Sequence, residues 1–324
     1  MPSITVSAAA FRRIAFATLV AYAAIIVTGG AVRLTGSGLG CPDWPACYHH
    51  GLTAAFSFHP MVEFVNRCIT VAVTVLTVVV IAAAVWRSPR RRDLVQLSSA
   101  IGAGIVAQIV MGGLVVHFDL NPYLVMAHFL LSVLIVGVAA TLWYRSGLPD
   151  GSSPGRGRPV VGKELVWLGR ILLVSVAAVI AAGTAVTGAG PHAGDPHAGV
   201  RRIPVAFRDI AELHSTMAMF LIGLMLATVF ALRQARAPEP VQRRAQLLFE
   251  LLVVQGALGF TQYFLHDNPL VVGVHMAVAT AVFAGAVLLY LSLFGHEAPT
   301  RDSSDDDPGT LDRVRPEAVV AHTA

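Results

Sequence analysis

Eight apolar runs, each close to the length that spans a membrane, dominate the pattern of hydrophobic and polar positions. They cover residues 12–32, 61–86, 94–116, 123–144, 165–187, 209–232, 246–265 and 270–294. A helix needs roughly 20 apolar residues to cross a bilayer core of about 30 Å, and lipid offers no partner to unpaired backbone groups. The pattern therefore predicts an all-α bundle of eight transmembrane helices. The first run is too long for a signal peptide, and we expect it to remain as a helix.

Charge is scarce and unevenly placed. The chain is 55% hydrophobic and 13% charged, whereas a soluble domain usually carries about 25% charged residues. Most basic residues fall at the start of the first run or in alternate connections: Arg12, Arg13, Arg87, Arg90, Arg91, Arg92, Arg156, Arg158, Lys163, Arg233, Arg236, Arg243 and Arg244. By the positive-inside rule, both termini are expected in the cytoplasm and the protein in the cell membrane. This distribution argues against a nucleic-acid partner, despite the net charge of +4.

Two halves of the chain repeat each other. Gln108 and Gly112, an Asn-Pro pair and then His128 recur as Gln255 and Gly259, a second Asn-Pro pair and His275, at a constant offset of 147 residues. An ungapped match of this kind indicates duplication. Because each half has an even number of spans, both have the same orientation, which predicts an axis along the membrane normal.

The repeat suggests four parts. We expect an N-terminal four-helix half over residues 1–145, a cytoplasmic linker over 146–164, a C-terminal four-helix half over 165–294 and a disordered cytoplasmic tail over 295–324. The linker is rich in Gly, Pro and Ser, and the tail is polar and acidic.

The cysteines suggest an oxidised outer loop. Cys41 and Cys47 lie in the first loop expected outside the cell, where a disulfide can persist. A zinc site that also uses His49 and His50 is the alternative. Cys68 lies within the second span and is most simply a packing residue.

Three histidines within the spans are expected at one depth. His128 and His275 each lie six residues after the proline that should start their helix, about 9 Å along it, and His214 lies similarly far into the sixth span. Two such histidines can clamp a heme iron from both faces. The C-terminal half has the pair His214 and His275, whereas in the N-terminal half His128 faces Asn66. Hydrogen-bonded bundle residues without a cofactor are the alternative.

Glu63 lies three residues before Asn66 and therefore on the same helix face. A carboxylate enclosed by apolar helices can serve as a base near neutral pH. The alternative, compatible with that role, is an ion pair with Arg67 that stabilises the helix.

Three arginines oppose the usual bias because they lie on the outer side: Arg33, Arg201 and Arg202. They could pair with the propionates of outward-facing hemes. His192, Asp195 and His197 lie in the same outer loop as the last two arginines. A generic solvated loop explains His197, Arg201 and Arg202 equally well, and the roles of His192 and His197 stay open.

Several of these segments resemble the heme A synthases, over nearly the whole chain. The resemblance is carried by four segments: Arg33-Leu-Thr-Gly-Ser-Gly-Leu-Gly-Cys-Pro-Asp-Trp-Pro-Ala-Cys47, Glu63-Phe-Val-Asn-Arg67, Thr187-Gly-Ala-Gly-Pro-His-Ala-Gly-Asp195 and the two Asn-Pro…His segments. The first, a long outer-loop motif, is the most specific of them.

The resemblance implies an enzyme that oxidises a methyl group of heme O to a formyl group, giving heme A for terminal oxidases. It implies His214 and His275 as ligands of a resident heme b, Glu63 as the catalytic carboxylate and His128 as a ligand of the substrate heme. Family members commonly have a histidine where this chain has Asn66, so the resemblance does not carry over six-coordinate binding of the substrate iron. The third outer loop also lacks the cysteine pair that some members carry.

The implied reaction has two steps, through a hydroxymethyl heme, with water as the oxygen source and the heme b relaying electrons. The expected partners are heme O, the heme O synthase and a membrane electron acceptor, and a homo-oligomer is compatible with the sequence. A b-type electron carrier and a heme transporter are the alternatives. An intramembrane Glu63 beside a missing ligand favours the enzyme, since a pure carrier would have two closed sites.

Overall fold

The fold is a bundle of long helices. A computed structural model describes residues 5–48, 51, 53–150, 157–192, 194 and 200–295. Within this part of the chain the helices are α1 (Ala8–Leu34), α2 (Phe58–Val85), α3 (Arg92–His117), α4 (Pro122–Ser146), α5 (Lys163–Ala189), α6 (Phe207–Gln234), α7 (Glu239–Phe264) and α8 (Pro269–Ser292). All eight are long and apolar enough to cross a membrane. The predicted all-α, eight-helix, multi-pass membrane bundle is therefore confirmed.

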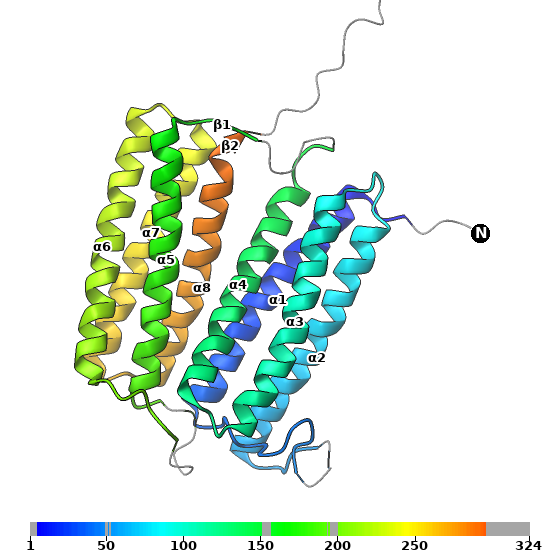
Figure 1. Ribbon diagram of the computed structural model, residues 1–324, viewed down its shortest axis with the longest axis vertical. Helices are drawn as coiled ribbons and strands as arrows, with labels where there is room; N and C mark the ends of the chain where they lie inside the picture. Colours follow the sequence, from blue (N-terminus) through cyan, green and yellow to red (C-terminus); the bar gives the residue numbers. More distant parts are fainter. Residues whose placement is uncertain are drawn as a thin grey trace, which may run out of the picture.

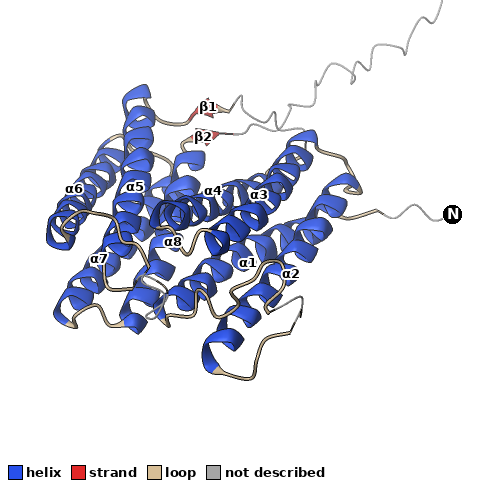
Figure 2. Ribbon diagram, turned by 60° about the horizontal axis from the view of Figure 1, so that its bottom comes forward, coloured by secondary structure: helices blue, strands red, loops and turns tan. Residues whose placement is uncertain are grey.

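A small strand pair was not expected from the sequence. The strands β1 (Arg158–Pro159) and β2 (Phe294–Gly295) pair antiparallel, and Figure 2 shows them together at one end of the bundle. They join the segment before α5 to the segment after α8. Two-residue strands carry too few side chains to show the alternation from which strands are predicted.

The helices lie in two groups of four, α1 to α4 and α5 to α8 (Figure 1). Helix α8 joins the groups, because it packs against α1 and α4 as well as α5 and α7. Glycines permit this approach. A Cβ atom on Gly30 would come within 2.7 Å of Met276, and one on Gly137 within 2.9 Å of Phe283. Small residues at helix contacts are the usual means of close packing in membranes.

Helices α4 and α8 start in the same way. Asn121 accepts a hydrogen bond from Tyr123 N at 3.0 Å, and Asn268 accepts one from Leu270 N at 3.0 Å. A proline follows each asparagine at the first helical position, where its missing N–H costs nothing. The prolines start their helices as the sequence predicted, which places His128 and His275 at equal distances along α4 and α8.

Some arginines at the end that carries the N-terminus have a structural role in addition to any effect on topology. Arg87 pairs with Asp150 at 2.7 Å, and Arg91 pairs with Asp93 at 2.8 Å. Arg91 also donates to the Leu148 carbonyl at 3.1 Å. Both arginines are buried, and they tie the connection between α2 and α3 to the segment that follows α4.

Candidate functional site

The loop between α1 and α2 is built around a disulfide and one arginine. Cys41 and Cys47 are joined, which confirms the predicted bridge and leaves neither sulfur free as a zinc ligand. His49 and His50 lie outside the described residues. Arg67, on α2, donates to three carbonyls of this loop: Cys41 O at 2.9 Å, Ala46 O at 2.8 Å and Asp43 O at 3.1 Å. One guanidinium group therefore fixes the shape of the disulfide-closed loop.

Glu63 belongs to the same arrangement. Its Oε2 accepts a hydrogen bond from Cys41 N at 2.8 Å, and its Oε1 accepts one from Arg67 Nε at 3.1 Å. The carboxylate is 6% exposed. The ion pair that the sequence offered as an alternative is thus present, and it is compatible with a role in proton transfer because a carboxylate has about four lone-pair sites.

His128, on α4, has two neighbours on α3, namely Gln108 and Gly112. Gln108 Nε2, on α3, donates to the His128 carbonyl at 3.0 Å. A Cβ on Gly112, one turn further along α3, would lie 3.6 Å from His128 Cε1. The ring nitrogen Nδ1 is buried with no hydrogen-bond partner among the described residues.

The same setting recurs around His275. Gln255 Nε2, on α7, donates to the His275 carbonyl at 3.1 Å, and a Cβ on Gly259 would lie 3.5 Å from His275 Cε1. His275 Nδ1 is also buried without a partner among the described residues. These matched contacts support the interpretation of two related halves. They also give the motif glutamines and glycines a role that the sequence left unassigned, namely to seat the histidines.

His214 faces His275 across the C-terminal group. Their ring centres are 6.4 Å apart. His214 Nδ1 donates to the Val179 carbonyl at 3.0 Å, which leaves Nε2 as the nitrogen with a free lone pair. A hydrogen bond from the second ring nitrogen to a carbonyl is typical of metal-binding histidines. Gly183 makes room for the ring, since a Cβ there would lie 3.0 Å from His214 Cε1.

These distances fit a heme iron between the two rings. An imidazole nitrogen binds a first-row metal at about 2 Å. The ring centre lies about 1.2 Å beyond that nitrogen, so two imidazoles on opposite sides of one metal have centres about 6 Å apart. The observed 6.4 Å suits such a group.

The side chain of Asn66 is hydrogen-bonded to α1. Its Oδ1 accepts a hydrogen bond from Thr28 of α1 at 2.8 Å, and its side chain lines a groove of about 600 Å³ between α1 and α2. Among the described residues, no hydrogen bond joins Asn66 or Glu63 to His128. The structure therefore brings His214 and His275 together directly, whereas Glu63 is tied to the outer loop and Asn66 to α1.

Arg33 bridges the two groups of helices. Its Nε donates to the His192 carbonyl at 2.8 Å and its Nη2 to the Thr187 carbonyl at 3.1 Å. His192 in turn donates from Nε2 to the Asp267 carbonyl at 2.8 Å. These contacts join the end of α1 to the α5–α6 connection, and that connection to the one between α7 and α8.

Arg201 and Arg202 differ from Arg33. Arg201 and Arg202 are exposed, which is as expected for a solvated loop and leaves them free for another partner. Asp195 and His197 lie outside the described residues. A propionate contact remains a prediction for all three arginines.

The chain is thus a multi-pass helical membrane protein with half-buried histidines among its helices and a disulfide-closed loop between α1 and α2. It belongs to the cytochrome oxidase assembly protein family (COX15-CtaA), whose family model matches residues 12–194, more than half of the chain. The match ends before α6, so His214 and His275 lie beyond it, and the case for this pair rests on their own geometry and on the repeat.

Individual relatives match over shorter stretches. A protein of Geobacillus thermodenitrificans named heme A synthase is 32% identical over 119 residues, which are 36% of this chain and 37% of the relative. A heme A synthase of Lysinibacillus sphaericus is 34% identical over 118 residues, or 35% and 38%. One of Listeria monocytogenes is 28% identical over 121 residues, or 36% and 39%. Each match thus spans less than two fifths of the relative's length.

The disulfide should be oxidised and reachable from outside intact cells. Cys68 faces outward from α2, so the test should use a Cys68→Ala background in which only Cys41 and Cys47 can react. A thiol reagent that does not cross membranes should label this protein only after reduction. Labelling without reductant would mean that the two thiols are free.

His214→Ala or His275→Ala should each remove a low-spin heme and most of the activity that depends on it, because two imidazoles of one pair make iron low-spin. The measurement is the heme content and optical spectrum of the purified variants. His117→Ala, at the exposed end of α3, is the matched control and should keep both. An unchanged heme spectrum in His275→Ala would show that the resident heme is held elsewhere.

Proposed function

We propose that this protein is a heme A synthase, which oxidises a methyl group of heme O to a formyl group. One observation carries the proposal. The glutamine, glycine and histidine contacts occur twice, and only in the C-terminal group does a second histidine complete the pair. Two sites with a histidine pair each would suit an electron carrier, which keeps both hemes. One site with a histidine pair and one with a single histidine suit an enzyme that keeps one heme and releases another. The names of the relatives and the family membership agree with this reading.

The resident cofactor would be a heme b held by His214 and His275. Their ring spacing and the hydrogen bond from His214 to Val179 support this assignment. Such a heme would transfer electrons one at a time towards an acceptor in the membrane. The protein contributes the placement of both residues: Gln255 binds the His275 backbone carbonyl, and Gly259 and Gly183 leave room for the His275 and His214 rings.

Substrate heme would be held by His128 from one side only. The Asn66 oxygen, the one atom of that amide able to bind iron, already accepts a hydrogen bond from Thr28. An amide is also a poor heme ligand compared with imidazole. Weak binding is compatible with turnover, because a product that must leave gains nothing from a second strong ligand.

Glu63 would be the catalytic carboxylate. Conversion of a methyl to a formyl group removes four electrons and four protons and adds one oxygen atom, here from water, in two steps through a hydroxymethyl heme. A base is therefore needed at the carbon that reacts. Arg67 and Cys41 N fix both oxygens of Glu63, and such fixed orientation favours proton transfer.

The same proposal indicates the source of heme O, the destination of the electrons and the orientation of the protein in the membrane. Heme O would come from the heme O synthase, and the electrons would leave to a membrane acceptor. The arginine-rich connections favour both termini on the cytoplasmic side, which puts the disulfide loop outside, in an oxidising medium.

The decisive experiment is pigment analysis. The protein is expressed together with a heme O producer in cells that lack their own heme A, and the ratio of heme A to heme O is measured in the membranes. Heme A should appear only when this protein is present. An electron carrier would bind heme and leave heme O unchanged, and a heme transporter would change only the amount of heme O retained.

Glu63→Gln should bind heme O and fail to convert it, with a fall in rate on the order of 10²–10⁴-fold, as is typical when a general base is lost. The amide keeps the shape of the side chain, so heme b content should not change. Glu212→Gln is the matched control, because Glu212 also pairs with an arginine one turn away on its helix but is exposed. Normal heme A production by Glu63→Gln would mean that Glu63 serves only as the partner of Arg67.

Asn66→His should tighten the binding of heme O and convert its iron from high-spin to low-spin, because a second imidazole completes the axial pair. Activity should be kept or modestly changed. His128→Ala should abolish retention of the substrate heme and leave the resident heme in place. Optical spectra of the purified variants loaded with heme O test both results, and an unchanged high-spin spectrum in Asn66→His would place Asn66 away from the substrate iron.

A further inference from the structure

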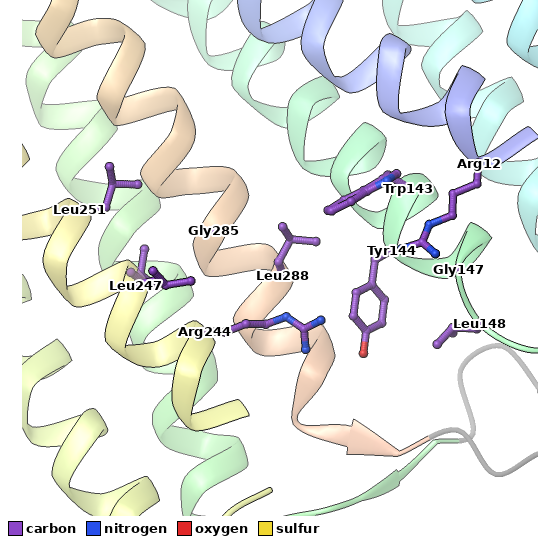
Figure 3. Close-up of a pocket in the computed structure, with 11 residues that line it drawn as sticks. Arg12, Trp143, Tyr144, Gly147, Leu148, Arg244, Leu247, Leu251, Gly285 and Leu288 are labelled. Atoms are coloured by element: carbon purple, nitrogen blue, oxygen red, sulfur yellow. The ribbon is translucent and has the colours of Figure 1, made fainter. Parts of the chain in front are cut away.

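A second cavity lies far from the histidines, at the end of the bundle that carries the N-terminus. Figure 3 shows it between the two groups of helices, with side chains from α1, α4, α7 and α8 around it. Its volume is about 370 Å³, within the range of about 300–1,000 Å³ that is usual for ligand sites. Its polar rim is formed by Arg12, Trp143, Tyr144 and Arg244, and its apolar wall includes Leu247, Leu251 and Leu288.

The rim and the wall lie at different depths in the membrane. Arg12 is in the first turns of α1 and Arg244 in the first turns of α7, while Trp143 and Tyr144 are in the last turn of α4. These positions put the rim at the membrane surface, where tryptophan and tyrosine are enriched. Leu251 lies two turns deeper on α7 than Arg244. The cavity thus changes from cationic and aromatic at the surface to aliphatic towards the bilayer interior.

The guanidinium groups of Arg12 and Arg244 are both able to bind an anion. Arg12 lies 6.0 Å from the centre of the Trp143 ring, and Arg244 lies 5.6 Å from that of Tyr144. Neither makes an ion pair with an acidic side chain among the described residues. Arg87 and Arg91, at the same end, are neutralised by aspartates. Stacking on an aromatic ring holds a guanidinium in place and leaves its N–H groups free for a phosphate.

We propose that this cavity binds an anionic phospholipid, with its phosphate between Arg12 and Arg244 and an acyl chain along Leu247, Leu251 and Leu288. Charge complementarity at the surface and the aliphatic wall beneath it match the two parts of such a lipid. Basic pockets between helices on the cytoplasmic side are a known setting for acidic lipid headgroups. The lipid would join the two groups of helices where Tyr144 of α4 already donates to the Leu291 carbonyl of α8 at 3.4 Å. This site is independent of the proposed heme chemistry.

The test compares two double variants of the whole protein, each purified in mild detergent. Arg12→Gln with Arg244→Gln removes the two charges that line the cavity. Arg13→Gln with Arg243→Gln removes two charges from neighbouring exposed positions that do not line it. Retained phospholipid is extracted and quantified by class. Each protein is then titrated with phosphatidylglycerol or phosphatidylcholine in the same detergent, and its thermal unfolding is followed.

The wild type and the Arg13 and Arg243 control should retain phosphatidylglycerol and be stabilised by it, and not by phosphatidylcholine. The cavity variant should lose affinity for phosphatidylglycerol on the order of 10- to 30-fold, because it lacks two arginines that each attract the anionic headgroup at the membrane surface. Its heme content should match the control, which checks that the bundle is intact. Equal losses in both variants, unchanged retention in the cavity variant, or equal stabilisation by both lipids would each overturn the proposal.

Discussion

A bilayer offers no hydrogen-bond partner to a buried polar group, and the arrangement of this protein depends on that constraint. Most polar side chains inside the bundle are therefore expected to bind the backbone or another side chain. Gln108 and Gln255 bind the carbonyls of the histidines on the next helix, and Tyr22 pairs with Thr77 at 2.8 Å. A few buried atoms have no partner among the described residues, and Nδ1 of His128 and of His275 are two of them.

The same constraint explains how the loop between α1 and α2 is shaped. A short loop above α2 has many carbonyls and few side chains that could satisfy them. Arg67 supplies several N–H groups from one position, and Glu63 holds Arg67 in turn. Because the pair stabilises the loop and orients a carboxylate at once, a structural role and a chemical role for Glu63 do not compete. The same residue can serve both roles, and a separate experiment is needed to test each role.

Much of this could be predicted from the sequence, because helices of membrane length and helix-starting prolines leave strong local signals. The eight spans, the starts of α4 and α8 and the Cys41–Cys47 bridge followed from such signals. The contacts that define the site did not. Arg33 binds carbonyls of a distant segment, and Thr28 engages Asn66. A backbone carbonyl is present at every residue, so the sequence carries no sign of which one an arginine will reach.

The contact between Tyr144 and Leu291 has a consequence for the symmetry of the fold. The two residues are 147 positions apart, the offset at which the halves repeat, so Tyr144 touches the position that is its own equivalent. In a symmetric dimer such a contact can occur only beside the two-fold axis. Helices α4 and α8 would therefore flank the pseudo-two-fold axis that the sequence repeat predicts between the two groups of helices.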